Sequence, residues 1–406
     1  MSSVRGLVII GGGAAGIGAA DEARRRGVDA LIVEAGNRLG GRAHSIEWNG
    51  HALDLGCTWM HSAERNSLRV EAERLRLVID RNPTGWFSQY RDLGFPPEDR
   101  EAAFRAFEEL EERMRTTPPP SDRASDLLEP GNPWNPWLEA ISSYINGASL
   151  EEVSVADWLA YDNAATEQNW RLPGSYGALV AQLGAQFDHR LASPVTAVSR
   201  LPDSVRATTA EGVIESERVV VTVPTSTLHR IRFDPPIAGI VEAAAELPLG
   251  LADKLFLSLD EADEFPHGAH LVGNPHSSET GSYFLNPMGI PVVEAFFGGN
   301  GARALEELGD EGAAAFMAEE LAGLLGSGIR KRVKPIARSR WAHHDWIRGA
   351  YSHALPGQAA MRQRLAEAGD DRIAFAGEAV SAADYSTAHG AFDSGREAVR
   401  RLCAGR

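Results

Sequence analysis

The residues with the clearest chemical meaning stand near the start of the chain. Gly11, Gly13 and Gly16 follow the apolar run 7–10, and Glu34 closes a second apolar run 23 residues after Gly11. Glycines at this spacing let a pyrophosphate approach the backbone at a helix N-terminus, and the acid can accept hydrogen bonds from a ribose diol. The pattern therefore predicts a dinucleotide site. The alternative, a glycine-rich turn that binds nothing, leaves Glu34 unexplained.

Short regular elements must position these residues. The apolar run 7–10 predicts a strand, and the alanine-rich run after the glycines predicts a helix to about Arg26, which Gly27 ends. The run 30–33 predicts the next strand. Strand, glycine turn, helix, strand and acid, in this order, form the βαβ unit that binds dinucleotides.

The segment after the acid distinguishes NAD from FAD. Residues 37–42 read Asn-Arg-Leu-Gly-Gly-Arg and resemble the R-x-G-G-R stretch of the glutathione-reductase-like FAD proteins. This resemblance implies FAD as the cofactor. Arg42 is placed to reach the pyrophosphate as a charged hydrogen-bond donor.

Composition and charge exclude several classes of protein. A formal net charge of −16 argues against a nucleic-acid partner, because the phosphate backbone requires a positive surface. No apolar run approaches the roughly 18 residues of a membrane span, and the N-terminus lacks a secretory pattern, so we expect a cytoplasmic protein without a membrane partner. Cys57 and Cys403 give neither a disulfide framework nor a zinc spacing, and no metal site is expected.

Apolar periodicity outlines the rest of the chain. Helices are expected over 104–114, over 306–325 and from about Thr387 to Leu402, and the Pro-rich run 116–137 predicts a loop. Strands are expected in four apolar runs: 194–198, 218–223, 254–259 and 373–376.

These elements predict an α/β fold. We expect a Rossmann-like FAD-binding domain of the glutathione-reductase type, with an α+β substrate domain made of insertions. The FAD-binding domain is assigned residues 1–63, 171–246 and 335–406, and the substrate-binding domain residues 64–170 and 247–334.

Several passages, in order along the chain, resemble the flavin-containing amine oxidases. Residues 54–61 (D-L-G-C-T-W-M-H) resemble the D-L-G-x-x-W-x-H segment of polyamine-type oxidases, and Pro224 ends a strand with the family's T-V-P sequence. Similar elements follow at 340–341 (R-W), 348–352 (R-G-A-Y-S), 375–378 (F-A-G-E) and 387–391 (T-A-H-G-A). The resemblance covers essentially the whole chain.

The resemblance implies roles for individual side chains. Lys254, one of three lysines among 40 basic residues, stands where the family carries a lysine that holds a water against flavin N5 and assists reoxidation. Tyr351 matches one wall of the family's aromatic cage, and the opposite wall falls on Thr387 rather than a second tyrosine. The alternatives are a charge at a strand end for Lys254 and a buried structural tyrosine for Tyr351.

Other aromatic residues have more open interpretations. We expect Trp59 and His61 to face the substrate, although His61 fits an ordinary loop histidine equally well. Trp341 is expected beside the flavin, with a place in the core as its alternative. His389 opens the last helix, and its imidazole is expected to be structural.

The expected cofactor contacts are drawn from eight separate segments. They are Gly11, Gly13, Ala14, Ala15, Gly16, Glu34, Ala35, Gly41, Arg42, Gly56, Cys57, Thr58, Trp59, Val195, Trp341, Gly377, Glu378, Thr387 and Ala388.

Two departures from the family pattern restrict the chemistry. Members with covalent flavin carry Cys just before the cage tyrosine; here that residue is Ala350, which implies non-covalent FAD. Amino-acid oxidases place an Arg after the D-L-G segment to bind the substrate carboxylate. Residues 57–60 contain no Arg, so an amino-acid substrate is disfavoured.

The implied activity is oxidation of an amine with O2 as the acceptor. Hydride passes from the carbon next to the nitrogen to flavin N5, water hydrolyses the imine, and O2 leaves as hydrogen peroxide. The alternatives are a flavin dehydrogenase or desaturase with another acceptor, and an FAD-holding module without turnover. The sequence names neither the amine, whether monoamine, polyamine or cyclic, nor the oligomeric state.

Overall fold

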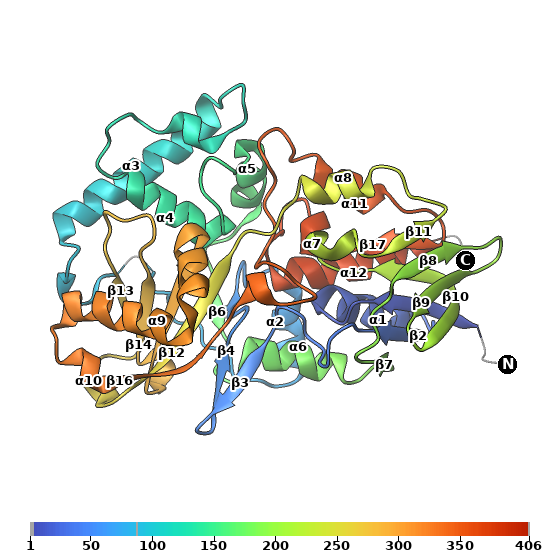
Figure 1. Cartoon of the computed structure of the whole chain (residues 1–406), viewed down its shortest axis with the longest axis horizontal. Helices are drawn as coiled ribbons and strands as arrows, with labels where there is room; N and C mark the ends of the chain where they lie inside the picture. Colours follow the sequence, from blue (N-terminus) through green and yellow to red (C-terminus); the bar gives the residue numbers. More distant parts are fainter. Residues whose placement is uncertain (1–3, 87, 405–406) are drawn as a thin grey trace.

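The computed structural model describes residues 4–86 and 88–404 of the chain. It contains two main sheets, one toward each end of the longest axis (Figure 1). The first elements follow the expected order: strand β1 (Arg5–Ile10), helix α1 (Ala14–Arg25) and strand β2 (Ala30–Val33). β1 and β2 pair in parallel, so the glycine turn and Glu34 meet at the carboxyl ends of neighbouring strands. The expected βαβ unit is therefore present.

The larger sheet has eight strands in the order β11-β8-β9-β10-β1-β2-β7, and β17 also pairs with β10. β1, β2, β10 and β17 pair in parallel and are almost entirely apolar where they pair, as expected of a sheet covered on both faces. Its other strands are β7 (His189–Arg190), β8 (Ala197–Arg200), β9 (Val205–Thr209), β10 (Gly212–Val221), β11 (Arg232–Asp234) and β17 (Ile373–Phe375).

Helix α12 (Ala388–Cys403) packs against α1 at backbone contact distance (Figure 1). A methyl group added at Gly18 would lie 2.0 Å from the Phe392 carbonyl oxygen, and one added at Gly395 would lie 1.9 Å from that of Ala15. Gly16 has a similar role, because a methyl group there would lie 1.9 Å from the Gly11 carbonyl oxygen. Glycine at these positions lets α1 contact both α12 and its own preceding turn.

The second sheet is antiparallel, in the order β13-β14-β15-β12-β16. Its strands are β12 (Ala252–Leu259), β13 (Ala269–Val272), β14 (Ser282–Leu285), β15 (Val292–Gly298) and β16 (Val333–Arg338). Helix α9 (Gly299–Leu325) packs on this sheet, and Gly309 interrupts it with a φ of 72°. Strand β16 pairs with β12 as far as Arg338, so this sheet extends past residue 334. The division into two domains stays a prediction.

Three further helices lie together beside the second sheet (Figure 1), and of these α4 packs on β15: α3 (Pro97–Thr116), α4 (Asn135–Asn146) and α5 (Val155–Ala164). The Pro-rich run 116–137 was expected to be loop throughout. It contains a 3-10 turn, Ala124–Leu127, and α4 begins at Asn135 because proline is well accommodated in a first helical turn. The strand expected at 194–198 begins only at Ala197.

The remaining elements are short. Two small hairpins pair β3 (Ser45–Trp48) with β4 (His51–Asp54), and β5 (Trp59–Met60) with β6 (Trp170–Arg171). The other helices are α2 (Ser67–Arg74), α6 (Tyr176–Gly184), α7 (Thr225–Leu228), α8 (Ile240–Ala245), α10 (Ile329–Arg332) and α11 (Met361–Glu367). Within the described ranges, no helix combines the length and apolar character needed to cross a bilayer.

The contact between α1 and α12 predicts a strong effect of a single methyl group. Gly395→Ala places a carbon against a backbone oxygen, and we expect it to lower the free energy of unfolding by about 2–3 kcal/mol. Gly323→Ala is the matched control, because that exposed helical position has no atom within 4 Å; there we expect a gain of about 0.5–1 kcal/mol. Urea unfolding of both variants checks the pair, and equal effects would contradict the packing argument.

Candidate active site

One cavity of about 1090 Å³ is bordered by both sheets and by helices α3 to α5. Of the residues predicted to form the site, Gly16 does not line this cavity; its place is the contact between α1 and the preceding turn. The others do: Gly11, Gly13, Ala14, Ala15, Glu34, Ala35, Gly41, Arg42, Gly56, Cys57, Thr58, Trp59, His61, Val195, Lys254, Trp341, Tyr351, Gly377, Glu378, Thr387 and Ala388.

The glycine-turn end of the cavity is suited to a dinucleotide. Glu34 accepts hydrogen bonds from the backbone N–H groups of Gly12 and Gly36, each at 2.6 Å, and each oxygen keeps a further lone pair for a ribose hydroxyl. The N-terminus of α1 has no side-chain cap and no acidic residue in its first turn. Free N–H groups at a helix N-terminus attract phosphate. These residues fit FAD.

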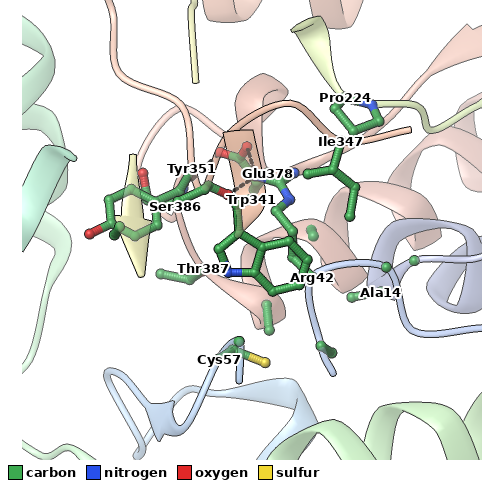
Figure 2. A pocket seen from close by; sticks show the side chains of 18 of the residues that line it. Ala14, Arg42, Cys57, Pro224, Trp341, Ile347, Tyr351, Glu378, Ser386 and Thr387 are labelled. Atoms are coloured by element: carbon green, nitrogen blue, oxygen red, sulfur yellow. Dashed lines mark hydrogen bonds and ion pairs between the residues drawn. The ribbon is translucent and has the colours of Figure 1, made fainter. Parts of the chain in front are cut away.

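Arg42 and Glu378 connect the first and last parts of the chain at this cavity (Figure 2). Arg42 Nη1 donates to Glu378 Oε1 at 2.8 Å and to the Ala350 carbonyl oxygen at 2.6 Å. The opposite oxygen of Glu378 accepts from the Ser352 hydroxyl at 2.6 Å and from Ser386 N–H at 3.0 Å. Burial opposes ionisation of Glu378, but the charge of Arg42 and the Ser352 hydroxyl lower its pKa below the usual range. Contact of Arg42 with a pyrophosphate stays a prediction.

Lys254 belongs to a buried ionic cluster that the sequence analysis found only in part. Its Nζ contacts Thr58 Oγ1 and lies 3.2 Å from Glu294 Oε1. The other oxygen of Glu294 accepts from Arg171 Nη2 at 2.6 Å. Burial alone would raise the pKa of Glu294, but the charges of Arg171 and Lys254 lower it to about 2. Glu294 interrupts an apolar strand, as Lys254 does, so the same signal could have identified it.

Aromatic side chains lie beside Arg171 of this cluster and elsewhere in the cavity wall. Trp59 stands edge-on to Trp86 with ring centroids 4.9 Å apart, and the Arg171 guanidinium lies 4.8 Å from the Trp59 ring. The Tyr351 hydroxyl donates to the Tyr144 carbonyl oxygen at 2.6 Å, and burial raises the pKa of this phenol. That bond fixes the ring of Tyr351 in the cavity wall. Neither Trp86 nor Tyr144 was singled out from the sequence.

His61 is held as a neutral imidazole. Its Nδ1 pairs with Asn169 Oδ1 at 2.8 Å, and burial lowers its pKa to about 4, assisted by the charges of His389 and Lys254. Since Asn169 Oδ1 is an acceptor, the imidazole proton lies on Nδ1 and Nε2 has a free lone pair.

For three further residues singled out from the sequence, the surroundings indicate a structural role. Thr387 caps α12, where its hydroxyl accepts from Gly390 N–H at 3.0 Å and donates to the Asp384 carbonyl oxygen at 2.7 Å. His389 is buried, with Nε2 3.2 Å from Asp384 Oδ1, in keeping with a structural imidazole. Burial raises the pKa of the Cys57 thiol to about 12, which keeps it protonated and a poor nucleophile.

The far end of the cavity is built from helices whose role the sequence did not reveal. Phe104 and Phe107 from α3 and Tyr161 from α5 line it, together with the carboxylates of Glu111 and Asp162. Burial, and then the neighbouring Asp162, raise the pKa of Glu111. Arg115 lies 2.5 Å from Asp162 and 3.5 Å from Glu111, so one cation faces two acids.

The contacts of Glu34 predict its effect on cofactor retention. Glu34→Ala leaves the N–H groups of Gly12 and Gly36 without their acceptor and removes the expected ribose partner. We expect FAD affinity to fall by a factor of about 10–100, the effect of losing charge-assisted hydrogen bonds worth about 1.5–3 kcal/mol. Flavin fluorescence during dialysis measures the loss, with the exposed Glu397→Ala as the control. Unchanged retention would remove Glu34 from the site.

Comparison with proteins of known sequence finds relatives along nearly the whole chain. Polyamine oxidase 3 of Oryza sativa subsp. japonica is 28% identical over 96% of this chain and 87% of its own length. Polyamine oxidase 2 of Arabidopsis thaliana is 26% identical, over 96% and 86%. A solved structure of putrescine oxidase bound to putrescine superposes with a TM-score of 0.82 at 19% identity, covering 99% of both chains. That last likeness shows a shared fold.

Family models account for the two parts of the sequence. A model for NAD(P)-binding Rossmann-like domains matches residues 9–72, and a model for flavin containing amine oxidoreductases matches residues 72–403. The glycine turn, the Lys254 cluster and the aromatic walls all border one cavity within these matches. The chain therefore belongs to the flavin containing amine oxidoreductases, as an FAD-dependent enzyme that acts on the CH–NH bonds of amines.

Proposed function

We propose that the protein oxidises a linear diamine or polyamine and that O2 receives the electrons. The observation that carries this proposal is one cavity that combines the dinucleotide cradle and Lys254 with an aromatic, acidic far end. Bound FAD supplies the two-electron acceptor for the carbon next to the amine nitrogen. The chain itself contributes orientation, exclusion of water and charge.

Three residues would orient the reacting nitrogen. The rings of Tyr351 and Trp341 line the cavity and offer flat faces to an amine or ammonium group (Figure 2). The free Nε2 lone pair of neutral His61 can accept a hydrogen bond from an amine N–H. None of these contacts requires a charged base, so we propose that the reacting nitrogen binds as the neutral amine.

A second, cationic nitrogen would be accommodated at the far end. Glu111 and Asp162 are two acids with one cation, Arg115, between them, an arrangement that favours a further ammonium group nearby. Two relatives are named polyamine oxidases and one structural neighbour is described with putrescine bound, which supports this class of substrate. A monoamine would bring no second cation to these two acids, which would then share Arg115 alone.

Two other functions compete with this proposal. A dehydrogenase would pass electrons to a carrier instead of O2, and the buried ammonium of Lys254 favours O2, because reduction of O2 builds negative charge that a fixed cation stabilises. A non-catalytic FAD module has no need for a charged cluster beside an aromatic wall. Non-covalent FAD and a cytoplasmic location remain part of the proposal.

Anaerobic titration of the yellow holoenzyme with putrescine, spermidine, benzylamine and a cyclic amine tests the function directly. We expect bleaching by the diamine or polyamine, and recolouring with formation of peroxide when air enters. Bleaching by benzylamine alone would contradict the substrate class. Bleaching without rapid recolouring would identify a dehydrogenase, and a flavin that no amine bleaches would leave only the FAD site.

The position of Lys254 predicts an effect confined to reoxidation. Lys254→Met removes the ammonium group, and we expect the rate of recolouring in air to fall at least about tenfold, while anaerobic bleaching changes less. Lys334→Met is the control, because that lysine is exposed and distant in the sequence from the cluster. Stopped-flow absorbance separates the two half-reactions. Equal rates of reoxidation in the variant and the control would exclude a role with O2.

The neutral state of His61 predicts the origin of the pH dependence. With a pKa of about 4, its imidazole stays uncharged above pH 5, so a rise of kcat/KM between pH 6 and 9 reflects loss of a proton from the substrate nitrogen. We therefore expect His61→Gln to change the height of the pH profile and not its midpoint. A midpoint that moves would assign the titration to His61.

A further inference from the structure

Two buried carboxyl groups meet behind the part of the cavity wall that carries Trp341. Asp253 of β12 is 1% exposed and Glu306 of α9 is 4% exposed, and the two carboxyl groups accept hydrogen bonds from consecutive backbone N–H groups, those of Trp341 and Ala342. Asp253 Oδ2 receives no hydrogen bond from any N–H or hydroxyl group of the described residues. Two carboxyl groups held side by side in this way can bond to each other only if one of them keeps a proton.

The pair is attached to the backbone of the cavity wall on both sides. Asp253 Oδ1 accepts from Ser339 Oγ at 2.6 Å and from Trp341 N–H at 3.3 Å. The Ser339 oxygen in turn accepts from Lys254 N–H at 2.9 Å. Glu306 accepts from Ala342 N–H at 3.0 Å and contacts His343 Nδ1. A proton between the two carboxyl groups would therefore link the turn Trp341–His343, which both groups bind, to strand β12, which carries Lys254.

No arginine or lysine neutralises the two acids. Lys254, the next residue of β12, pairs with Glu294, and neighbouring residues of a strand point to opposite faces. Arg338 of β16 binds Asp310 at 2.6 Å and the Leu305 carbonyl oxygen at 2.7 Å, and its remaining nitrogen, Nη2, bonds to neither acid nor to any other group of the described residues. Within the described chain, the one basic group that forms an ion pair with either carboxyl is His343, whose side chain is 58% exposed.

We propose that Asp253 and Glu306 share a single proton and act as a positioning pair that holds Trp341 in the cavity wall beside the flavin. The inference goes beyond the proposed function, because it concerns the cofactor end of the site and holds for any amine. Two like charges at contact distance in a buried site repel strongly, so loss of the proton would release the Trp341 turn. The phenol of Tyr351, the remaining titratable group near Asp253, stays neutral.

The titration of the pair sets the pH range over which the stability of the protein changes. Burial, and then the hydrogen bond and charge of Glu306, raise the pKa of Asp253 to about 8, against the opposing effect of Ser339. An unfolded chain loses the same proton near pH 4. Between about pH 4 and 8 the native state therefore holds a proton that the unfolded state lacks, and stability falls as pH rises through this window. Above about pH 8 both states have lost the proton, so this contribution is constant.

The substitution Asp253→Asn removes the ionisable group but keeps the hydrogen bonds that the side chain at position 253 forms. The amide N–H₂ can donate to Glu306, and its oxygen can accept from Ser339 and Trp341. We expect the holoenzyme variant to match the wild type at pH 5 and to unfold at least about 3 °C higher at pH 9. Asp310→Asn, an exposed acid of the same helix, is the control and should follow the wild type. A difference that is the same at every pH would overturn the shared proton.

The absorption spectrum of the bound flavin, recorded without amine between pH 5 and 9.5, tests the link to Trp341. We expect a pH-dependent change of the flavin bands centred near pH 8 in the wild type and in Asp310→Asn, and none in Asp253→Asn. Glu306→Gln removes the like charge and should move the change to lower pH by roughly one unit or more. The same spectral change in Asp253→Asn would overturn the positioning role. Because no substrate is present, failure here is distinct from failure of the proposed function.

Discussion

Three distant segments of the chain meet at the carboxylate of Glu378, and the active site depends on that meeting. Arg42 arrives from the dinucleotide-binding turn, Ser352 from the segment that carries Tyr351, and Ser386 from the approach to α12. A buried charge is tolerated only when such partners surround it, and removing one partner of a buried ion pair costs about 3–5 kcal/mol. The same bonds that neutralise Glu378 therefore hold the flavin-binding and substrate-facing segments in register.

The second sheet also contains buried carboxyl groups, and it stabilises them in two different ways. Glu294 is ionised between Lys254 and Arg171, and of these three charged residues Lys254 and Glu294 line the cavity. Asp253, the residue beside Lys254, lies on the opposite face, where it meets an acid instead of a base. One strand thus presents a fully ionic network to the cavity and a protonated pair to the interior. The contrast arises from the alternation of side chains along a strand.

Local sequence patterns predicted the elements around the glycine turn, but they did not predict which distant side chains pair at the site. The run from β1 to Glu34 could be predicted because its apolar and glycine positions act over a few residues. Lys254 was recognisable as an isolated charge in an apolar strand, and Glu294 carries the same signal. The bond from His61 to Asn169, and the approach of Glu111 to Asp162, join residues 108 and 51 positions apart. Such contacts follow from how helices and strands pack, which periodicity does not encode. The start of β8 was misplaced because Val195, although apolar and buried, lies before the strand.

The backbone contact between α1 and α12 has a consequence for synthesis of the chain. The face of α1 formed by Ala15, Gly18 and Asp21 is completed by Gly395 and Arg396, and Arg396 binds Asp21 at 2.6 Å across 375 positions. The ribosome synthesises the glycine turn and α1 early and α12 last. Helix α1 therefore lacks its packing partner during most of translation. Contacts of such sequence separation slow folding. A nascent chain that has not yet reached Gly395 lacks the packing of α12 against the helix that follows the glycine turn.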